Sequence, residues 1–484
     1  MRDRGATVKR LCWLVPLLAL LGCGSATGIT TSTVAVPRAA TASKTAALPP
    51  IKHVFTIILE NESASTTFGP NPPAPYLAKT LTSEGAYLPN YYGIGHASND
   101  NYIAMISGQP PNTLNREDCP LFENFALPST GAYGAENGLG CVYPSNIQTV
   151  AGQLDAAGLT WRDYNESMGN TPTREAAECG HPAVGSPDNT ESETAQDAYA
   201  TRHDPFVYFH SIIDSTTLCD SHVVNLSLLP HDLSSAADTP NYVFITPDLC
   251  GDGHDATCAD TSRPGGFAGI EQFLAQWVPQ ITGSPAFKSQ NGLLIVTFDE
   301  AATSDASACC GEIPGPGASE PGGSGPGGGD VGAVLLSPCI KPGTVTQTPY
   351  NHYTMLRSIE DIFGLAHLGY AQLPGETSFG SDVFTQPCAF PTKPRISASA
   401  RRKKITVRWS TTDPGGPGIA RYAVEVRQLR GAGGAWKTLS GLGATRKRSA
   451  VYRAKASARY QFRVEFVDKL GKTSPWATTK RISG

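Results

Sequence analysis

Two unbroken hydrophobic runs in this chain end in acidic residues. They are residues 54–59, which lead into Glu60 and Asn61, and residues 293–298, which lead into Asp299 and Glu300. Apolar runs of this length are typical of strands buried on both faces, as in a parallel sheet covered by helices. Ligands of such sheets bind beyond the carboxyl ends of the strands. We therefore expect three carboxylates and an amide at one sheet edge, where oxygen ligands of this kind indicate a metal ion.

Apolar strands alternate with amphipathic helical stretches between residues 51 and 390, which predicts an α/β fold with a mainly parallel sheet sandwiched by helices. The expected strands are 53–59, 242–246, 292–298 and 331–337, and the expected helices are 75–84, 101–107, 146–157, 267–282 and 352–363. The stretch between Ala301 and Gly329 is rich in Gly, Pro and Ser and has little to build a core with. We expect a mobile surface loop there.

The C-terminal residues 391–484 follow a different pattern, in which apolar and polar positions alternate. The alternating segments are 405–409, 422–426 and 460–466, with Gly-rich turns between them. A period of two with frequent turns predicts an all-β sandwich, and the segment resembles a fibronectin type III domain. The resemblance places Trp409 in the core and Tyr460 at a tyrosine corner. It also predicts that the last strand begins at residues 474–476.

The N-terminus predicts export. Basic residues precede an apolar run that is too short to span a bilayer and fits a signal peptide over residues 1–23. Residues 20–23 resemble a bacterial lipobox in which Cys23 is acylated, so a cell-envelope lipoprotein and a soluble secreted protein both agree with the pattern. The predicted organisation is a signal peptide (1–23), a flexible linker (24–50), a catalytic domain (51–390) and a β-sandwich (391–484).

Charge and cysteine content change at the same boundary. Residues 391–484 carry 22 Lys and Arg against 4 Asp and Glu, and the totals of 38 and 42 leave 16 and 38 for residues 1–390. A basic module can bind an anionic polymer or a membrane surface, or it can be a solvated face; nothing beyond charge indicates nucleic acid. Ten cysteines between Cys119 and Cys388 predict disulfides, with Cys119–Cys141 and Cys250–Cys258 as plausible local pairs.

Four polar segments supply further candidate residues. They are 95–102 with His96, Ser98 and Asn101, 247–255 with Asp248, Asp252, His254 and Asp255, 350–353 with His352, and 203–206 with His203. A serine at the start of a helix can be a nucleophile beside a bound phosphate, since helix N-termini attract anions. Three aspartates and a histidine within eight residues suit metal or phosphate binding. Each segment also has a structural interpretation as a helix cap or a charged surface loop.

Taken in order, these motifs resemble the phosphoesterase family that unites acid phosphatases with bacterial phospholipases C, within the alkaline phosphatase superfamily. The matching segments are 58–61, 96–102, 252–255, 297–300, 351–353 and 357–365. The stretch 161–168 looks most like the secreted acid phosphatase branch, some members of which act on phosphoinositides. The resemblance implies an exported metal-dependent phosphomonoesterase. The alternatives are a phospholipase C-type phosphodiesterase acting on a lipid headgroup and, in another class, a non-catalytic polymer-binding surface protein.

The resemblance also implies a role for each site residue. Glu60, Asn61, Asp299 and Glu300 would hold a divalent metal, with Ser98 as a further ligand and Asp252 as a ligand or as the partner of His254. Ser98 would attack phosphorus and form a phosphoseryl intermediate, with assistance from His96. The phosphoryl oxygens would be bound by Asn101, His254 and His352.

Two departures from the family pattern affect these expectations. The usual proline before the motif asparagine is Asp100 here, which would add a negative charge beside the phosphate site. The Asp-x-x-x-His pair that holds a second metal in zinc members of the superfamily is replaced by Asp248 and Asp252. We therefore expect one tightly held metal, and carboxylates with an amide suit calcium, magnesium or manganese better than zinc.

Overall fold

The structure is a computed structural model that describes residues 48–429 and 433–484. The expected signal peptide and all but the last three residues of the expected linker lie outside the described residues. In the part of the chain that the structure describes, no helix has the length and apolar character needed to cross a membrane.

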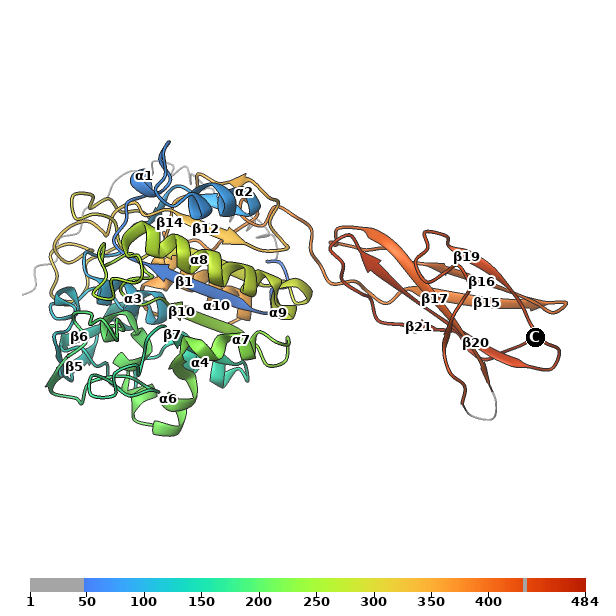
Figure 1. The fold of residues 1–484 in the computed structure, drawn as a ribbon, viewed down its shortest axis with the longest axis horizontal. Coiled ribbons are helices and arrows are strands. Elements are labelled where there is room, and N and C mark those ends of the chain that lie inside the picture. The colour runs from blue at the N-terminus through green and yellow to red at the C-terminus, as the bar shows by residue number, and fades with distance from the viewer. Residues whose placement is uncertain (1–47, 430–432) are drawn as a thin grey trace, which may run out of the picture. The chain divides into compact units, whose positions relative to one another are not determined.

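An eight-stranded, mainly parallel sheet forms the centre of the first part of the fold (Figure 1). Its strands in spatial order are β13 (Thr344–Val345), β2 (Ala86–Leu88), β12 (Ala333–Leu336), β11 (Leu293–Phe298), β1 (Val54–Leu59), β10 (Tyr242–Thr246), β7 (Trp161–Asn165) and β9 (Val223–Asn225). β1 runs parallel to both of its neighbours, whereas β12 is antiparallel to β11 and to β2. The predicted α/β fold is confirmed.

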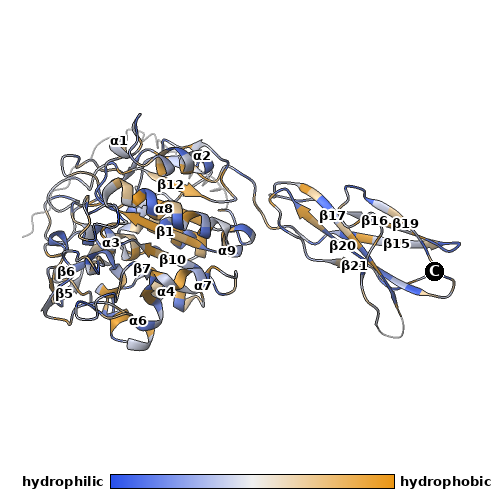
Figure 2. Cartoon of the chain, in the orientation of Figure 1, coloured by the Kyte–Doolittle hydropathy of each residue, from blue (hydrophilic) through white to orange (hydrophobic). Residues whose placement is uncertain are grey.

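The central strands β1, β10 and β11 are buried along their whole length. Figure 2 shows β1 and β10 as apolar strands, with α8 (Gly266–Gly283) across the sheet. Because both faces of these strands are covered, neither face needs polar residues, and the alternation typical of half-exposed strands is absent. This is the physical reason why an unbroken apolar run identified them in the sequence.

The other main helices are α3 (Ser98–Ser107), α4 (Val150–Ala156) and α10 (His352–Phe363). α10 begins where the sequence predicts, because Asn351 and Thr354 form a capping box. The shorter α-helices are α1 (Ala64–Thr67), α2 (Thr82–Glu84), α5 (His210–Ile213), α6 (Thr216–His222), α7 (Leu229–Asp232) and α9 (Pro285–Ser289). Short strand pairs are β3 (Tyr91–Tyr92) with β14 (Tyr350–Asn351), β4 (Leu121–Phe122) with β8 (Ser186–Pro187), and β5 (Ala126–Thr130) with β6 (Glu136–Leu139).

Residues 395–429 and 433–483 form two antiparallel sheets around a separate hydrophobic core. One sheet contains β15 (Arg395–Arg401), β16 (Lys404–Ser410) and β19 (Ser449–Arg453), and the other contains β17 (Ile419–Leu429), β18 (Lys437–Thr438), β20 (Arg459–Asp468), β21 (Ala477–Thr478) and β22 (Ile482–Ser483). Trp409 is buried in this core, as predicted. The Tyr460 hydroxyl accepts a hydrogen bond of 3.0 Å from the Lys455 backbone N–H, which is the contact expected of a tyrosine corner.

Five disulfides connect all ten cysteines of the described residues, and all of them precede residue 391. The two pairs predicted from local spacing, Cys119–Cys141 and Cys250–Cys258, are both present. The remaining bonds are Cys179–Cys219, Cys309–Cys310 and Cys339–Cys388. This number of disulfides is typical of proteins that fold in an oxidising, extracellular environment.

The Gly-rich stretch after Ala301 contains neither a helix nor a strand, as predicted, but it packs against the fold rather than lying free on the surface. The Gly328 backbone N–H donates to the Gly93 carbonyl at 3.0 Å. The buried Glu312 carboxylate accepts a hydrogen bond of 2.8 Å from Asn351 at the start of α10. Glycine permits this packing, because a Cβ at Gly328 would lie 2.3 Å from the Gly95 carbonyl oxygen.

Candidate active site

The register of the central strands places Glu60 and Asp299 side by side. Leu59, the last residue of β1, pairs with Phe298, the last residue of β11, so the next residue of each strand emerges at the same sheet edge. Asn61 then adopts a left-handed backbone conformation with φ of 62°, and its N–H donates to Asp299 Oδ1 at 2.9 Å. Both carboxylates are completely buried.

Ser98 lies at the first turn of α3, and its hydroxyl points to the same sheet edge. Ser98 Oγ donates a hydrogen bond of 2.9 Å to Glu60 Oε2. Ala97 is the N-cap residue, and it makes no side-chain capping bond. Helix capping therefore does not account for Ser98. Its position at the N-terminus of a ten-residue helix beside a carboxylate is suited to a nucleophile that meets an anionic substrate.

Asn101 holds the segment that precedes Ser98 in place. Its Oδ1 accepts from the Ile94 N–H at 2.7 Å, and its Nδ2 donates to the Ala97 carbonyl at 3.0 Å. The same Nδ2 lies 3.3 Å from Glu300 Oε2, which brings this buried carboxylate into the site. In this structure the amide is fully used by protein partners, so it positions the backbone around Ser98.

Asp252 reaches the same edge from the loop that follows β10. The Glu60 N–H donates to the Asp252 backbone carbonyl at 3.0 Å, and Asp252 Oδ1 accepts from the His254 N–H at 2.8 Å. Asp248, four residues earlier, is paired with Arg263, which donates hydrogen bonds to both of its carboxylate oxygens at 2.6 and 2.8 Å. Of these two aspartates, the structure brings Asp252 to Glu60 and pairs Asp248 with an arginine.

His203, a candidate in the sequence to which no role was assigned, belongs to this cluster. Its Nδ1 lies 3.2 Å from Asp252 Oδ2, and its Nε2 lies 3.5 Å from Glu60 Oε1. Tyr102 stacks on the imidazole with ring centroids 5.2 Å apart and donates to Glu60 Oε1 at 2.7 Å. Glu60, His203 and Asp252 form a buried triad whose ligand atoms are close enough to hold a metal ion. The only sequence signal was a histidine next to an aspartate.

His254 is part-exposed and has an arginine as its neighbour. Arg202 Nη2 lies 3.2 Å from His254 Nε2, and since a guanidinium only donates, Nε2 is the acceptor. The proton then resides on Nδ1, which donates to Asp255 Oδ1 at 2.8 Å. The Arg202 side chain is almost fully buried, and its positive charge acts on the carboxylates of both Glu60 and Asp252.

His352 and His96 have backbone partners. His352 Nε2 donates to the Asp299 carbonyl at 2.6 Å, and its Nδ1 lies 3.2 Å from the Tyr91 hydroxyl. Burial lowers the pKa of His352 to about 4, so the ring is neutral. His96 Nε2 lies 3.0 Å from the Asp305 carbonyl, and no hydrogen bond joins His96 to Ser98 among the described residues.

The electrostatics of this edge indicate a cation. Burial, with the charges of Asp299 and Asp252, raises the pKa of Glu60 well above its usual range, and burial raises the pKa of Asp299 to about 6. Burial and Asp299 likewise raise the pKa of Glu300. Asp299 Oδ2 and His203 Nε2 are buried without a hydrogen-bond partner in the described residues. The donor set therefore fits a divalent cation, which would offset the repulsion and satisfy these atoms.

The structure places Asp100 inside the fold. Its side chain is fully buried, with neither oxygen hydrogen-bonded, and a Cβ on Gly95 would lie 2.4 Å from Asp100 Oδ2. Burial, with a contribution from Asp118, raises the pKa of Asp100 well above its usual range. The buried environment therefore disfavours the negative charge that the sequence predicts at this position.

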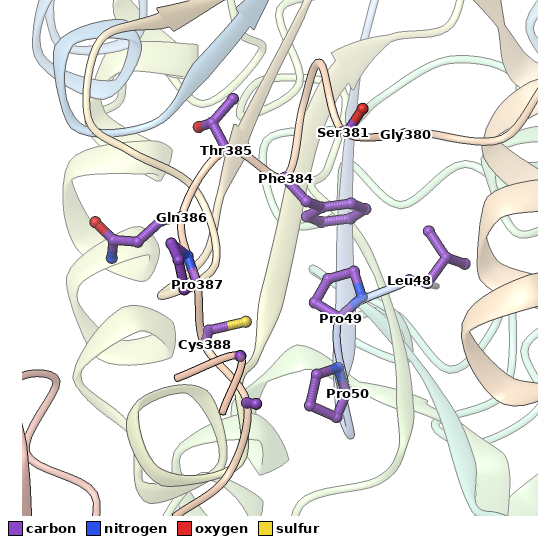
Figure 3. Close-up of a pocket in the computed structure, with 12 residues that line it drawn as sticks. Leu48, Pro49, Pro50, Gly380, Ser381, Phe384, Thr385, Gln386, Pro387 and Cys388 are labelled. Atoms are coloured by element: carbon purple, nitrogen blue, oxygen red, sulfur yellow. The ribbon is translucent and has the colours of Figure 1, made fainter. Parts of the chain in front are cut away.

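A separate apolar pocket lies away from these residues (Figure 3). Its lining includes Leu48, Pro49, Pro50, Phe384 and Pro387. None of the candidate site residues lines it. This pocket is therefore not part of the candidate site at the sheet edge.

Comparisons with known proteins identify the family to which the chain is similar. The phosphoesterase family matches residues 71–366 of this chain. The phosphatidylinositol-3-phosphatase of Mycobacterium tuberculosis is 27% identical over 376 residues, which cover 77% of this chain and 96% of that protein. The phosphate-repressible acid phosphatase of Penicillium chrysogenum is 27% identical over 369 residues, covering 73% and 72%. The acid phosphatase of Aspergillus fumigatus is 24% identical over 294 residues, covering 60% and 51%.

Proposed function

The chain belongs to the phosphoesterase family and is an acid phosphatase-like hydrolase of phosphoric esters, and from this premise we propose that it cleaves phosphate monoesters through a phosphoseryl intermediate on Ser98. The observation that carries the proposal is the 2.9 Å hydrogen bond from Ser98 Oγ to Glu60 Oε2 at the start of α3. It directs the hydroxyl proton to a carboxylate and leaves an oxygen lone pair free to attack phosphorus. The ester oxygen leaves with the alcohol, and water later releases phosphate from the serine.

A divalent cation would be held by Glu60, Asn61, Asp299 and Glu300, with Asp252 and His203 beside Glu60. When bound, it would supply positive charge that lowers the pKa of the Ser98 hydroxyl and offsets the charge of the phosphoryl group. Oxygen ligands favour magnesium, calcium or manganese, whereas an imidazole nitrogen at His203 would favour manganese or zinc.

The remaining residues divide into substrate-binding and positioning groups. His254 is part-exposed at the edge and accepts a hydrogen bond from Arg202. This pair is therefore suited to binding the phosphoryl oxygens of the substrate. Asn101 and His352 have their polar atoms committed to the backbone around Ser98 and Asp299. We assign them the positioning of these two residues.

The names of the relatives support a substrate class. A phosphatidylinositol-3-phosphatase is matched over nearly its whole length, and two fungal relatives are acid phosphatases. These names support a phosphomonoester, with a phosphoinositide as the proposed physiological class. A phosphodiesterase of the phospholipase C kind would use the same nucleophile on a lipid headgroup, and the substrate preference decides between the two.

The test compares hydrolysis of p-nitrophenyl phosphate and p-nitrophenyl phosphorylcholine by the full chain, with and without EDTA. We expect hydrolysis of the monoester, loss of activity with the chelator and recovery when a divalent metal is restored. Preference for the diester would replace the proposal by the phospholipase C alternative. Absence of activity on both substrates in folded, metal-loaded protein would refute it.

A further inference from the structure

The three-stranded sheet β15–β16–β19 has one face without any acidic residue. Its register pairs Arg401 with Lys404 and Lys404 with Arg453, and side chains two residues apart along each strand share this face. The side chains of this basic face are Arg395, Ser397, Ser399, Arg401, Lys404, Thr406, Arg408, Ser410, Ser449, Val451 and Arg453. The opposite face carries buried residues such as Ile405 and Val407, which belong to the hydrophobic core.

The cations of the basic face have no partners within the fold. Arg395, Arg401, Lys404, Arg408 and Arg453 are exposed. In residues 48–429 and 433–484, none of the five has a side-chain hydrogen bond or an ion pair. The four acidic residues of the C-terminal segment, Asp413, Glu425, Glu465 and Asp468, are on neither β15, β16 nor β19.

At one end of the basic face, the arrangement of like charges destabilises the fold. Arg401, Lys404 and Arg453 lie directly opposite one another on three adjacent strands, an arrangement of like charges that destabilises a sheet. The turn between β15 and β16 consists of Arg402 and Lys403, both with positive φ (46° and 60°). Glycine and asparagine are the residues that favour this conformation. Five cations are therefore gathered where stability alone would select other residues.

The other end of the face contains a hollow suited to a phosphate group. Arg395, Arg408 and Arg448 line it together with Ser397, Ser410 and Ser449, and its volume is about 500 Å³. Guanidinium groups donate pairs of hydrogen bonds that match a phosphate, and the serine hydroxyls provide further donors.

We propose that the basic face docks onto an anionic phospholipid membrane. Complementary charge attracts basic residues to such a surface. The face presents it with the directly opposed cations Arg401, Lys404 and Arg453 at one end and with Arg395 and Arg408 towards the other. A site for a single-stranded polynucleotide typically presents aromatic side chains on which the bases stack. The side chains of the basic face include no aromatic ring. The proposal deepens the proposed function, because a phosphoinositide substrate lies in the same membrane that the face would bind.

The experiment measures co-sedimentation of the full chain with vesicles of phosphatidylcholine alone and with vesicles that contain 30% phosphatidylserine. We expect binding to the anionic vesicles only, weakening as the salt concentration rises. The test variant is R401Q/K404Q/R453Q, and the matched control R421Q/K437Q/R459Q removes the same charge from the other sheet. Each adsorbed basic residue contributes about a fivefold factor, so the test variant should bind roughly 100-fold more weakly and the control should stay close to wild type.

Three outcomes would overturn the proposal. They are equal losses in both variants, which would assign binding to net charge, absence of wild-type binding to anionic vesicles, and binding to heparin or DNA in place of vesicles. Hydrolysis of soluble p-nitrophenyl phosphate should be unchanged in the test variant. Loss of vesicle binding with retained turnover therefore separates this inference from the proposed function, and unchanged melting temperatures show that the variants are folded.

Discussion

The Ser98 hydroxyl donates to the Glu60 carboxylate across 38 residues of sequence, at a distance of 2.9 Å. Two different elements make this contact: the end of the buried strand β1 and the first turn of α3. The contact ties the candidate nucleophile directly to the proposed cation site. Substitutions at Ser98, Asp299 and His203 each remove one member of this arrangement.

Ser98→Ala should lower turnover of p-nitrophenyl phosphate by at least about a thousandfold, because the nucleophilic oxygen is lost. The variant should keep its metal content, measured by mass spectrometry, and its far-ultraviolet circular dichroism. The control is Ser107→Ala at the other end of α3, which should retain activity. Turnover close to wild type in Ser98→Ala would contradict the proposed chemistry.

Asp299→Asn should lose metal and activity together. The amide can still accept the hydrogen bond from the Asn61 N–H, so the change removes a charge and leaves the local backbone intact. We expect the metal content to fall well below one equivalent and turnover to fall by at least about a hundredfold. Asp155→Asn, at an exposed residue of α4, is the control. Full metal content in Asp299→Asn would rule out this carboxylate as a ligand.

His203→Asn should weaken metal binding by about 10- to 100-fold, whether the imidazole binds the ion or orients Glu60 and Asp252. Titration calorimetry on the metal-free protein measures this directly. His231→Asn is the control, since that histidine also lies beside an aspartate but its side chain is 83% exposed. Unaltered metal affinity with a lower melting temperature would assign His203 a purely structural role.

Glu376→Gln should remove a pH dependence of stability. Burial raises the pKa of Glu376 to about 8, whereas the unfolded chain has a value near 4.5. The folded protein therefore binds more protons than the unfolded chain between these two values, and its stability falls as the pH rises through that window. The loss is at most about 1.4 kcal/mol per pH unit.

Glutamine resembles the neutral acid and can still accept the hydrogen bond from Asn351. Thermal melting between pH 5 and pH 8 should thus show a smaller decline for Glu376→Gln than for wild type. Glu84→Gln, at an exposed position in α2, should follow the wild-type curve. Identical slopes for all three proteins would show that Glu376 ionises normally.

The sheet edge could be predicted because its evidence is local. The unbroken apolar runs that end before Glu60 and Asp299 predict buried strands, and the parallel register then places the two residues side by side. The Cys250–Cys258 pair could be predicted in the same way, since the two cysteines are only eight positions apart. The α/β fold was predicted from unbroken apolar runs that alternate with amphipathic helical stretches. The C-terminal sheets were predicted from the alternation of apolar and polar positions.

The partners of the site could not be predicted, because they depend on how distant segments pack. His203 meets Glu60 across 143 positions of the chain, and no spacing rule connects them. The Gly-rich stretch was expected to be a mobile surface loop, but Glu312 within it accepts a hydrogen bond from Asn351. The antiparallel direction of β12 also leaves no mark on an apolar run of four residues.

The uneven distribution of disulfides has a practical consequence for handling the protein. Every disulfide of the described residues lies before residue 391, whereas the core of the C-terminal sheets is closed by packing alone. A mild thiol reductant should therefore loosen the α/β part selectively and make it sensitive to trypsin. The C-terminal sheets should survive the same digestion as a resistant fragment. Membrane binding of this fragment can then be measured in the absence of the α/β part.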